Sequence, residues 1–213
     1  QTCALPIYWP SLRKPNSTDR PKGLSFIQLP NSDSMTPMNI AMVGAGIGGL
    51  TAAACLLKNG HRVRLYEQAG NVHEIGAAVQ MSANAVKVLY HLGLRDSLER
   101  DGVKPLSFEF RRFDSGELLH EIRLGEDHQI RHGHPYYQIH RVDLHSALLS
   151  VVEGLDPQAV QLGARAAHVS EDETGAAIHF ADGTSVHADL VIGARSEEHT
   201  SELQSRETIS YAV

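Results

Sequence analysis

The sequence predicts an α/β fold: a Rossmann-like dinucleotide-binding domain into which antiparallel β-hairpins are inserted. A short apolar run of strand length, 38–43, leads directly into the glycine-rich stretch 44–49. An alanine-rich amphipathic pattern comes next, and a second strand-like run ends in an acidic residue. Farther along the chain, runs that alternate apolar and polar residues are separated by turn residues, which favours hairpins over further βαβ units.

Composition and charge restrict the class of protein. Of the 213 residues, 42% are apolar and 21% charged, as in globular domains, and no apolar run approaches the length of a membrane span. The net charge is −6 and the basic residues are scattered, so neither a nucleic acid nor an anionic lipid is expected as a partner. We expect a soluble, cytoplasmic protein. Two cysteines, Cys3 and Cys55, are too few for a disulfide framework or a metal knuckle.

The glycines after the first strand have the spacing of a phosphate-binding turn. Gly44 permits the tight turn out of the strand, Gly46 leaves room for a pyrophosphate, and Gly49 lets helix and strand pack closely. The next helix is predicted by apolar residues at i, i+3, i+4 and i+7, and Asn59-Gly60 ends it. A diphosphate would therefore lie on the helix N-terminus, where backbone amides point outward.

The second strand, 61–66, ends in Glu67, 21 residues after Gly46. An acid at this place offers a carboxylate to ribose hydroxyls and disfavours a 2′-phosphate, so the sequence predicts FAD or NAD rather than NADP at this site. The pattern after residue 75 distinguishes FAD from NAD. After a loop at 76–80 and a helix from Ser82, two hairpins are predicted, over 107–113 with 118–124 and over 176–180 with 184–188. Antiparallel insertions favour an FAD-binding domain of the glutathione-reductase type.

Both ends of the chain differ from the middle. Residues 1–37 are proline-rich without a helical or strand period, and we interpret them as a non-native or disordered leader. Residues 1–7 and 195–213 resemble translations of a sequencing-library adapter, which makes 195–213 a non-native tail. A genuine disordered N-terminal arm is the alternative for the leader. We expect residues 38–194 to be a partial FAD-binding domain that includes the start of a substrate domain, at about 107–140.

Residues 38–194 resemble the N-terminal portion of the single-component FAD-dependent aromatic hydroxylases, the salicylate, 3-hydroxybenzoate and 6-hydroxynicotinate monooxygenase group. Four stretches carry the resemblance: Val43-Gly-Ala-Gly-Ile-Gly-Gly-Leu50, Leu65-Tyr-Glu-Gln-Ala69, Gly76-Ala-Ala-Val-Gln-Met-Ser-Ala-Asn-Ala85 and His140-Arg-Val-Asp-Leu-His145. The stretch 188–194 resembles the strand before this family's Asp-Gly motif, in whose place this chain has Arg195-Ser196.

The resemblance implies roles for the matching positions. Four glycines would cradle the FAD diphosphate: Gly44, Gly46, Gly48 and Gly49. Other positions would bind the rest of the nucleotide: Glu67 and neighbouring Gln68 at the adenosine ribose, Arg141 at the flavin nucleotide, and Ala166, through its backbone, at the adenine. Gln80 lies where some members place a residue beside the substrate.

The residues by themselves leave other interpretations open for three of these positions. Arg141 would be an exposed residue that balances Asp143, Ala166 an ordinary strand alanine, and Gln80 an amide satisfied within its loop. Three histidines, His128, His132 and His134, superficially suggest a metal site, but no cysteine accompanies them and we expect surface-loop histidines and no metal.

The activity that the resemblance implies is hydroxylation of a small aromatic acid with NAD(P)H as co-substrate and O₂. By the same resemblance, three parts of the family are expected to be absent from these residues: the later Gly-Asp motif that holds the ribityl chain, most of the substrate sheet and the closing helix. No catalytic residue is therefore assigned, and the fragment is expected to be inactive alone. A homodimer of the full-length protein is expected. Two alternatives stay open: another flavoprotein of the same fold, reductase-like or halogenase-like, and a non-enzymatic NAD-binding module.

Overall fold

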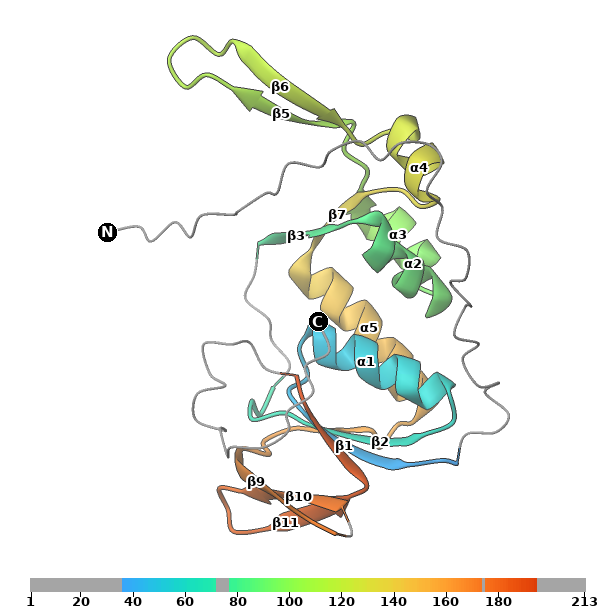
Figure 1. The fold of residues 1–213 in the computed structure, drawn as a ribbon, viewed down its shortest axis with the longest axis vertical. Helices are drawn as coiled ribbons and strands as arrows, with labels where there is room; N and C mark the ends of the chain where they lie inside the picture. The colour runs from blue at the N-terminus through green and yellow to red at the C-terminus, as the bar shows by residue number, and fades with distance from the viewer. Residues whose placement is uncertain (1–35, 72–76, 174, 195–213) are drawn as a thin grey trace, which may run out of the picture. The chain divides into compact units, whose positions relative to one another are not determined.

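The computed structural model describes residues 36–71, 77–173 and 175–194 (Figure 1). The chain divides into two units, 1–35 and 36–213, and every described residue belongs to the second. The predicted tail and all but two residues of the predicted leader lie outside the described residues, so the interpretation of both ends stays a prediction.

A parallel sheet of four strands forms the centre of the fold, in the order β12-β1-β2-β8. Its strands are β1 (Asn39–Val43), β2 (Arg62–Tyr66), β8 (Val160–Gln161) and β12 (Leu190–Gly193). β1 pairs in parallel with β2 on one side and β12 on the other. The first and last described strands are therefore neighbours, as expected of a Rossmann-like fold, and their carboxyl ends meet at one edge of the sheet.

Strand β1 contacts a different layer on each face, because successive side chains of a strand point to opposite sides. Ile40 and Met42 pack into a core with the helices α1 (Ile47–Lys58) and α5 (Arg141–Leu155). The two helices contribute fully buried side chains to it, among them Leu50, Ala53, Ala54, Leu144, Leu148 and Val152. Figure 1 shows α1 and α5 side by side over the sheet.

The opposite face of β1 is covered by an antiparallel sheet of three strands, β9 (Ala166–Asp172), β10 (Gly175–Phe180) and β11 (Ser185–Ala188). Ala41 and Val43 of β1 belong to the same buried cluster as Ile178 and Phe180 of β10. The Phe180 ring lies 4.9 Å from that of Tyr66, measured between centroids. The hairpin predicted at 176–188 is present as β10 and β11.

A second antiparallel sheet, in the order β3-β7-β4, consists of β3 (Ala78–Met81), β7 (Tyr137–His140) and β4 (Gly102–Val103). The helices α2 (Ala83–His91) and α3 (Arg95–Asp101) connect β3 to β4 along the chain. α2 begins immediately after Ser82, where the sequence predicts a helix start. β7 leads without a loop into α5.

The buried Tyr137 joins this sheet to α2 and α3 by hydrogen bonds. Its hydroxyl donates to Glu99 Oε1 at 2.8 Å and lies 3.1 Å from the Tyr90 hydroxyl. Lys104 Nζ donates to both oxygens of Glu99, at 2.9 and 2.8 Å. Burial and these bonds raise the pKa of Tyr137, whereas the bonds from Lys104 and Tyr137 lower the pKa of Glu99. The network therefore stabilises the neutral phenol and the charged carboxylate.

The first predicted hairpin is present as β5 (Ser107–Arg111) and β6 (Leu118–Arg123), followed by α4 (Glu126–His132). Several of its large apolar side chains are exposed, namely Phe110, Phe113, Leu118, Leu119 and Ile122. Five exposed large apolar side chains on one hairpin are more than scattered surface residues would normally give. No helix among the described residues is long and apolar enough to cross a membrane.

The Glu99 carboxylate gives a testable pH dependence. Because its pKa is lowered below 4.5 in the folded chain, its contribution to stability is complete above that pH and is lost as the pH falls through the folded pKa. Glu99→Gln should lower the free energy of unfolding at pH 7 by about 1 kcal/mol, measured by urea denaturation. Glu109→Gln is the control: Glu109 pairs with Arg111 at similar exposure but lacks a bond from the buried Tyr137, so this substitution should change the free energy of unfolding little. Identical losses in both variants would contradict this account.

Candidate functional site

The glycine-rich loop begins at the carboxyl end of β1. Gly44 has a φ of 107°, a conformation that side-chain-bearing residues rarely adopt, and its amide donates to the Tyr66 carbonyl at 2.8 Å. On the other side of β1, the Ala194 amide donates to the Val43 carbonyl at 2.8 Å. The loop therefore starts from a point that both neighbouring strands hold in place.

Gly48 and Gly49 meet different surroundings at the start of α1. A Cβ atom on Gly49 would collide with the Gly44 carbonyl oxygen, so only glycine fits where the helix passes the loop. A Cβ on Gly48 would meet no atom within 4 Å, and Gly48 is exposed. Gly49 is thus required by the packing of the protein itself, whereas Gly48 faces open space in which a ligand could lie.

The first turn of α1 has no side chain that competes for its amides. The N-cap residue is Gly46, which makes no side-chain cap bond, and the first turn contains no acidic residue. Free amides and the positive end of the helix dipole favour an anion at this position. The arrangement is the one that the glycine spacing predicts for a diphosphate.

The backbone of Ala45, between Gly44 and Gly46, is held from two sides. Its amide donates to Glu67 Oε2 at 2.9 Å, and its carbonyl accepts a hydrogen bond of 2.7 Å from Nε2 of His145 on α5. The other oxygen of Glu67 accepts from the Ala69 amide at 2.9 Å. A carboxylate has about four acceptor positions, so Glu67 can keep both bonds and still accept ribose hydroxyls.

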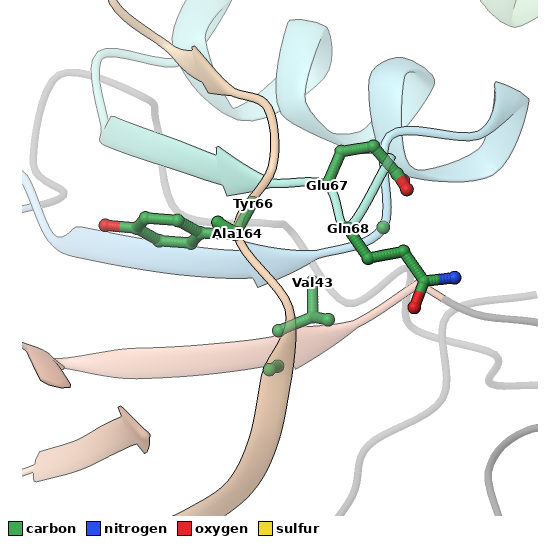
Figure 2. A pocket seen from close by; sticks show the side chains of 7 residues that line it. Val43, Tyr66, Glu67, Gln68 and Ala164 are labelled. Carbon is green, nitrogen blue, oxygen red and sulfur yellow. The ribbon is translucent and has the colours of Figure 1, made fainter. Parts of the chain in front are cut away.

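A small, open hollow lies beside this loop (Figure 2). It is lined by Val43, Gly44, Tyr66, Glu67, Gln68, Ala164 and Ala166. Figure 2 shows the side chains of Glu67 and Gln68 projecting past the end of β2, away from the Tyr66 ring. The two alanines, Ala164 and Ala166, contribute only methyl groups and backbone to this lining. The lining of the hollow therefore combines a carboxylate, an amide and small apolar side chains.

Four of the predicted site residues line this hollow, namely Gly44, Glu67, Gln68 and Ala166. Gly46, Gly48 and Gly49 follow Gly44 at the start of α1. Arg141 is the first residue of α5 and lies four residues before His145, which contacts Ala45. Residues four apart lie on the same face of a helix, so Arg141 shares the face of His145.

Gln80 lies elsewhere, and the expectation of a loop position for it was wrong. It belongs to β3, opposite Gln138 of β7, because residues 78–81 pair with that strand. Its amide oxygen accepts from the Tyr136 hydroxyl at 2.9 Å, and it does not line the hollow.

The placement of the histidines in a loop was also wrong in part. His128 and His132 lie four residues apart on α4, with ring centroids 4.5 Å apart, and only His134 lies beyond the helix. Burial, together with the neighbouring His132, lowers the pKa of His128. Among the residues that the structure describes, no group of three or more His, Cys, Asp or Glu side chains could hold a metal ion.

Two parts of the site were not predicted from the sequence. Ala164 lines the hollow because 161–164 continues beside 67–69, where the Ala164 amide donates to the Glu67 carbonyl at 2.8 Å. His145 ends one of the four stretches that carry the family resemblance, yet its contact with Ala45 spans 100 residues of chain. A lone histidine in a helical pattern carries no signal for such a long-range bond.

Comparison with known proteins agrees with this geometry. Residues 37–197 match the model of a family described as "FAD binding domain". The chain is 45% identical over 157 residues to a 3-amino-4-hydroxybenzoate 2-monooxygenase of Streptomyces cremeus, covering 74% of this chain and 39% of that protein. It is 38% identical over 154 residues to a 6-hydroxynicotinate 3-monooxygenase of Pseudomonas fluorescens, covering 72% and 39%.

Solved structures show the same fold. The crystal structure of Klebsiella pneumoniae HpxO complexed with FAD and uric acid matches with a TM-score of 0.63 and 34% identity, over 73% of this chain and 38% of that one. The chain thus spans about 39% of the length of the curated relatives it matches.

The two glycines of α1 make a matched pair of variants. Gly49→Ala should lower the free energy of unfolding by about 2 kcal/mol or more, because the new methyl group must displace backbone. Gly48→Ala should leave it unchanged or raise it by up to about 1 kcal/mol, since alanine favours helix. Urea denaturation without ligand measures both, and equal effects of the two substitutions would contradict the assigned packing.

Proposed function

The chain belongs to the FAD-binding domain family, and on this basis we propose that it supplies the adenosine-diphosphate half of the FAD site in a flavin-dependent aromatic monooxygenase. The observation that carries the proposal is the arrangement at Ala45. There a glycine turn, a helix N-terminus without a side-chain cap and the Glu67 carboxylate meet beside a hollow that is lined in part by small side chains.

The residues present fit this cofactor. Gly48 offers open space at the first turn of α1, where a diphosphate would lie, and Gly46 precedes that turn without a side chain. Glu67 retains acceptor positions for ribose hydroxyls, and Ala164 and Ala166 present only methyl groups and backbone on the side where the adenine would lie. These features support assigning Gly46 and Gly48 to the diphosphate. Gly44 and Gly49 are assigned to it on the resemblance, and in the structure they shape the turn and its packing against α1.

Three further positions are assigned on the resemblance and on their placement. Gln68 would bind near the ribose, since it lies beside Glu67 on the rim of the hollow. Arg141 would reach the flavin nucleotide from the start of α5. Gln80 would lie beside the substrate; its bond with Tyr136 fixes its amide orientation, so the NH₂ group is left to donate.

In the whole protein, bound FAD would supply the electron transfer and oxygen chemistry, with NAD(P)H as the reductant and a small aromatic acid as the substrate. The chain's own residues would bind and orient the adenosine and diphosphate part of the nucleotide. Because the chain spans about 39% of the length of its relatives, we propose that it does not hydroxylate a substrate alone. For the full-length protein we propose a cytoplasmic homodimer.

Binding of FAD to the full 213-residue chain tests the proposal directly. Glu67→Gln should weaken FAD binding about tenfold, measured by quenching of flavin fluorescence, because a charged acceptor for ribose hydroxyls is lost. Glu117→Gln, an exposed residue before β6, is the control and should bind FAD as the unaltered chain does. Tighter binding of NAD⁺ than of FAD would instead favour a non-enzymatic NAD-binding module.

The activity is tested on a longer product of the same gene. We expect a yellow flavoprotein that oxidises NADH or NADPH faster when a hydroxylated aromatic acid is added, with 6-hydroxynicotinate and 3-amino-4-hydroxybenzoate as first substrates to test, since relatives carry these names. The 213-residue chain is the matched control and should hydroxylate neither. A flavoprotein whose oxidation of NAD(P)H never yields a hydroxylated product would contradict the monooxygenase assignment.

A further inference from the structure

We propose that His145 is a positioning residue for the phosphate-binding loop: its hydrogen bond to the Ala45 carbonyl fixes the peptide that carries the Gly46 amide. The inference rests on the proposed FAD function, which assigns the loop to the diphosphate. His145 itself would touch no cofactor and would act through Ala45.

The geometry defines the state of the imidazole. His145 is 3% exposed, and its Nε2 lies 2.7 Å from the Ala45 oxygen. A carbonyl oxygen can only accept, so Nε2 must carry the hydrogen. The bond connects α5 to the loop after β1, and these elements are 100 residues apart in the chain. It is therefore a tertiary bond that the loop cannot form from its own residues.

The Ala45 carbonyl needs such a donor. The Leu50 amide donates to the Gly46 carbonyl at 2.9 Å, so the hydrogen bonds of helix α1 begin with the carbonyl of its N-cap, Gly46. The Ala45 oxygen lies one residue earlier, in a buried residue before the helix. A buried carbonyl without a partner costs about 1–3 kcal/mol, and the imidazole removes that cost.

The bond also orients the next amide. The structure contains no cis peptide among the described residues, and in a trans peptide the carbonyl and the following N–H point in opposite directions. With its carbonyl directed at His145, the Ala45–Gly46 peptide must direct the Gly46 N–H away from α5. The Glu67 bond fixes the preceding peptide through the Ala45 amide in the same manner.

Together the two bonds restrict both peptide planes that flank Ala45 before any ligand arrives. A loop that is already ordered loses less conformational entropy when it binds an anion, so its affinity is higher. Removing the His145 donor should free the Ala45–Gly46 peptide to rotate. The effect should appear both in the exchange of the loop amides and in the affinity for FAD.

Three variants of the full 213-residue chain separate positioning from packing. His145→Phe keeps a ring in the core but has no donor. His145→Gln keeps a side-chain N–H of similar reach and should restore the bond. His61→Phe is the matched control: His61 is also a buried histidine bonded to backbone, since its Nδ1 accepts from the Met38 amide at 3.3 Å, but it lies at the amino end of β2. Like His145→Phe, the His61→Phe variant loses a buried imidazole, but it does not lose a contact with the loop.

Hydrogen exchange of the peptide containing residues 44–50, measured without FAD, is the first readout. We expect faster exchange in His145→Phe, and exchange like that of the unaltered chain in His145→Gln and His61→Phe. FAD affinity is the second readout: His145→Phe should bind about tenfold more weakly, and His145→Gln within about threefold of the unaltered chain.

The outcomes distinguish the two proposals. If the unaltered chain binds no FAD, the assignment of the nucleotide site to this chain fails, while the exchange of 44–50 still decides the role of His145. The role of His145 is overturned if His145→Phe leaves loop exchange unchanged, or if His145→Gln is as impaired as His145→Phe. It is also overturned if His61→Phe accelerates loop exchange equally, because a general loss of stability would then explain the effect.

Discussion

The two hydrogen bonds of Ala45 are the interaction on which the site depends. They join three elements that the chain brings together from distant positions: the loop after β1, the end of β2 with Glu67, and α5 with His145. Glu67 therefore has two tasks. One of its oxygens accepts from the Ala45 amide and so holds the loop against β2. In addition, each oxygen can still accept one more hydrogen bond, for example from a ligand. The chain's own residues thus hold both peptide groups that flank Ala45.

The packing of the sheet explains why the loop can be held so closely. β1 is buried on both faces, by α1 and α5 on one side and by β9, β10 and β11 on the other, so its carboxyl end has little freedom. Gly49 then lets α1 pass against the Gly44 carbonyl. The hairpin of β5 and β6 is packed much less closely than β1, since its side chains Phe110 and Phe113 are exposed.

The local parts of this architecture could be predicted from the sequence, because each has a local cause. The glycine turn, the helix after it, the strand ending at Glu67 and both hairpins result from spacing and alternation within short windows. The contact of His145 with Ala45 and the place of Ala164 on the hollow could not be predicted, since both result from tertiary pairing. Gln80 shows the converse: its short segment has no strong strand pattern and becomes a strand only because β7 pairs with it.

The central claim is that these residues form the adenosine-diphosphate half of an FAD site, and two partial structures of FAD test it most directly: ADP, and FMN, which shares only one phosphate with ADP. Calorimetric titration of the 213-residue chain with ADP and, separately, with FMN distinguishes them, because only ADP carries the adenosine, ribose and diphosphate that the hollow and loop would hold. The account predicts that ADP binds and competes with FAD, whereas FMN binds far more weakly. Binding of FMN as tight as that of ADP, or no ADP binding by a chain shown to be folded, would contradict it.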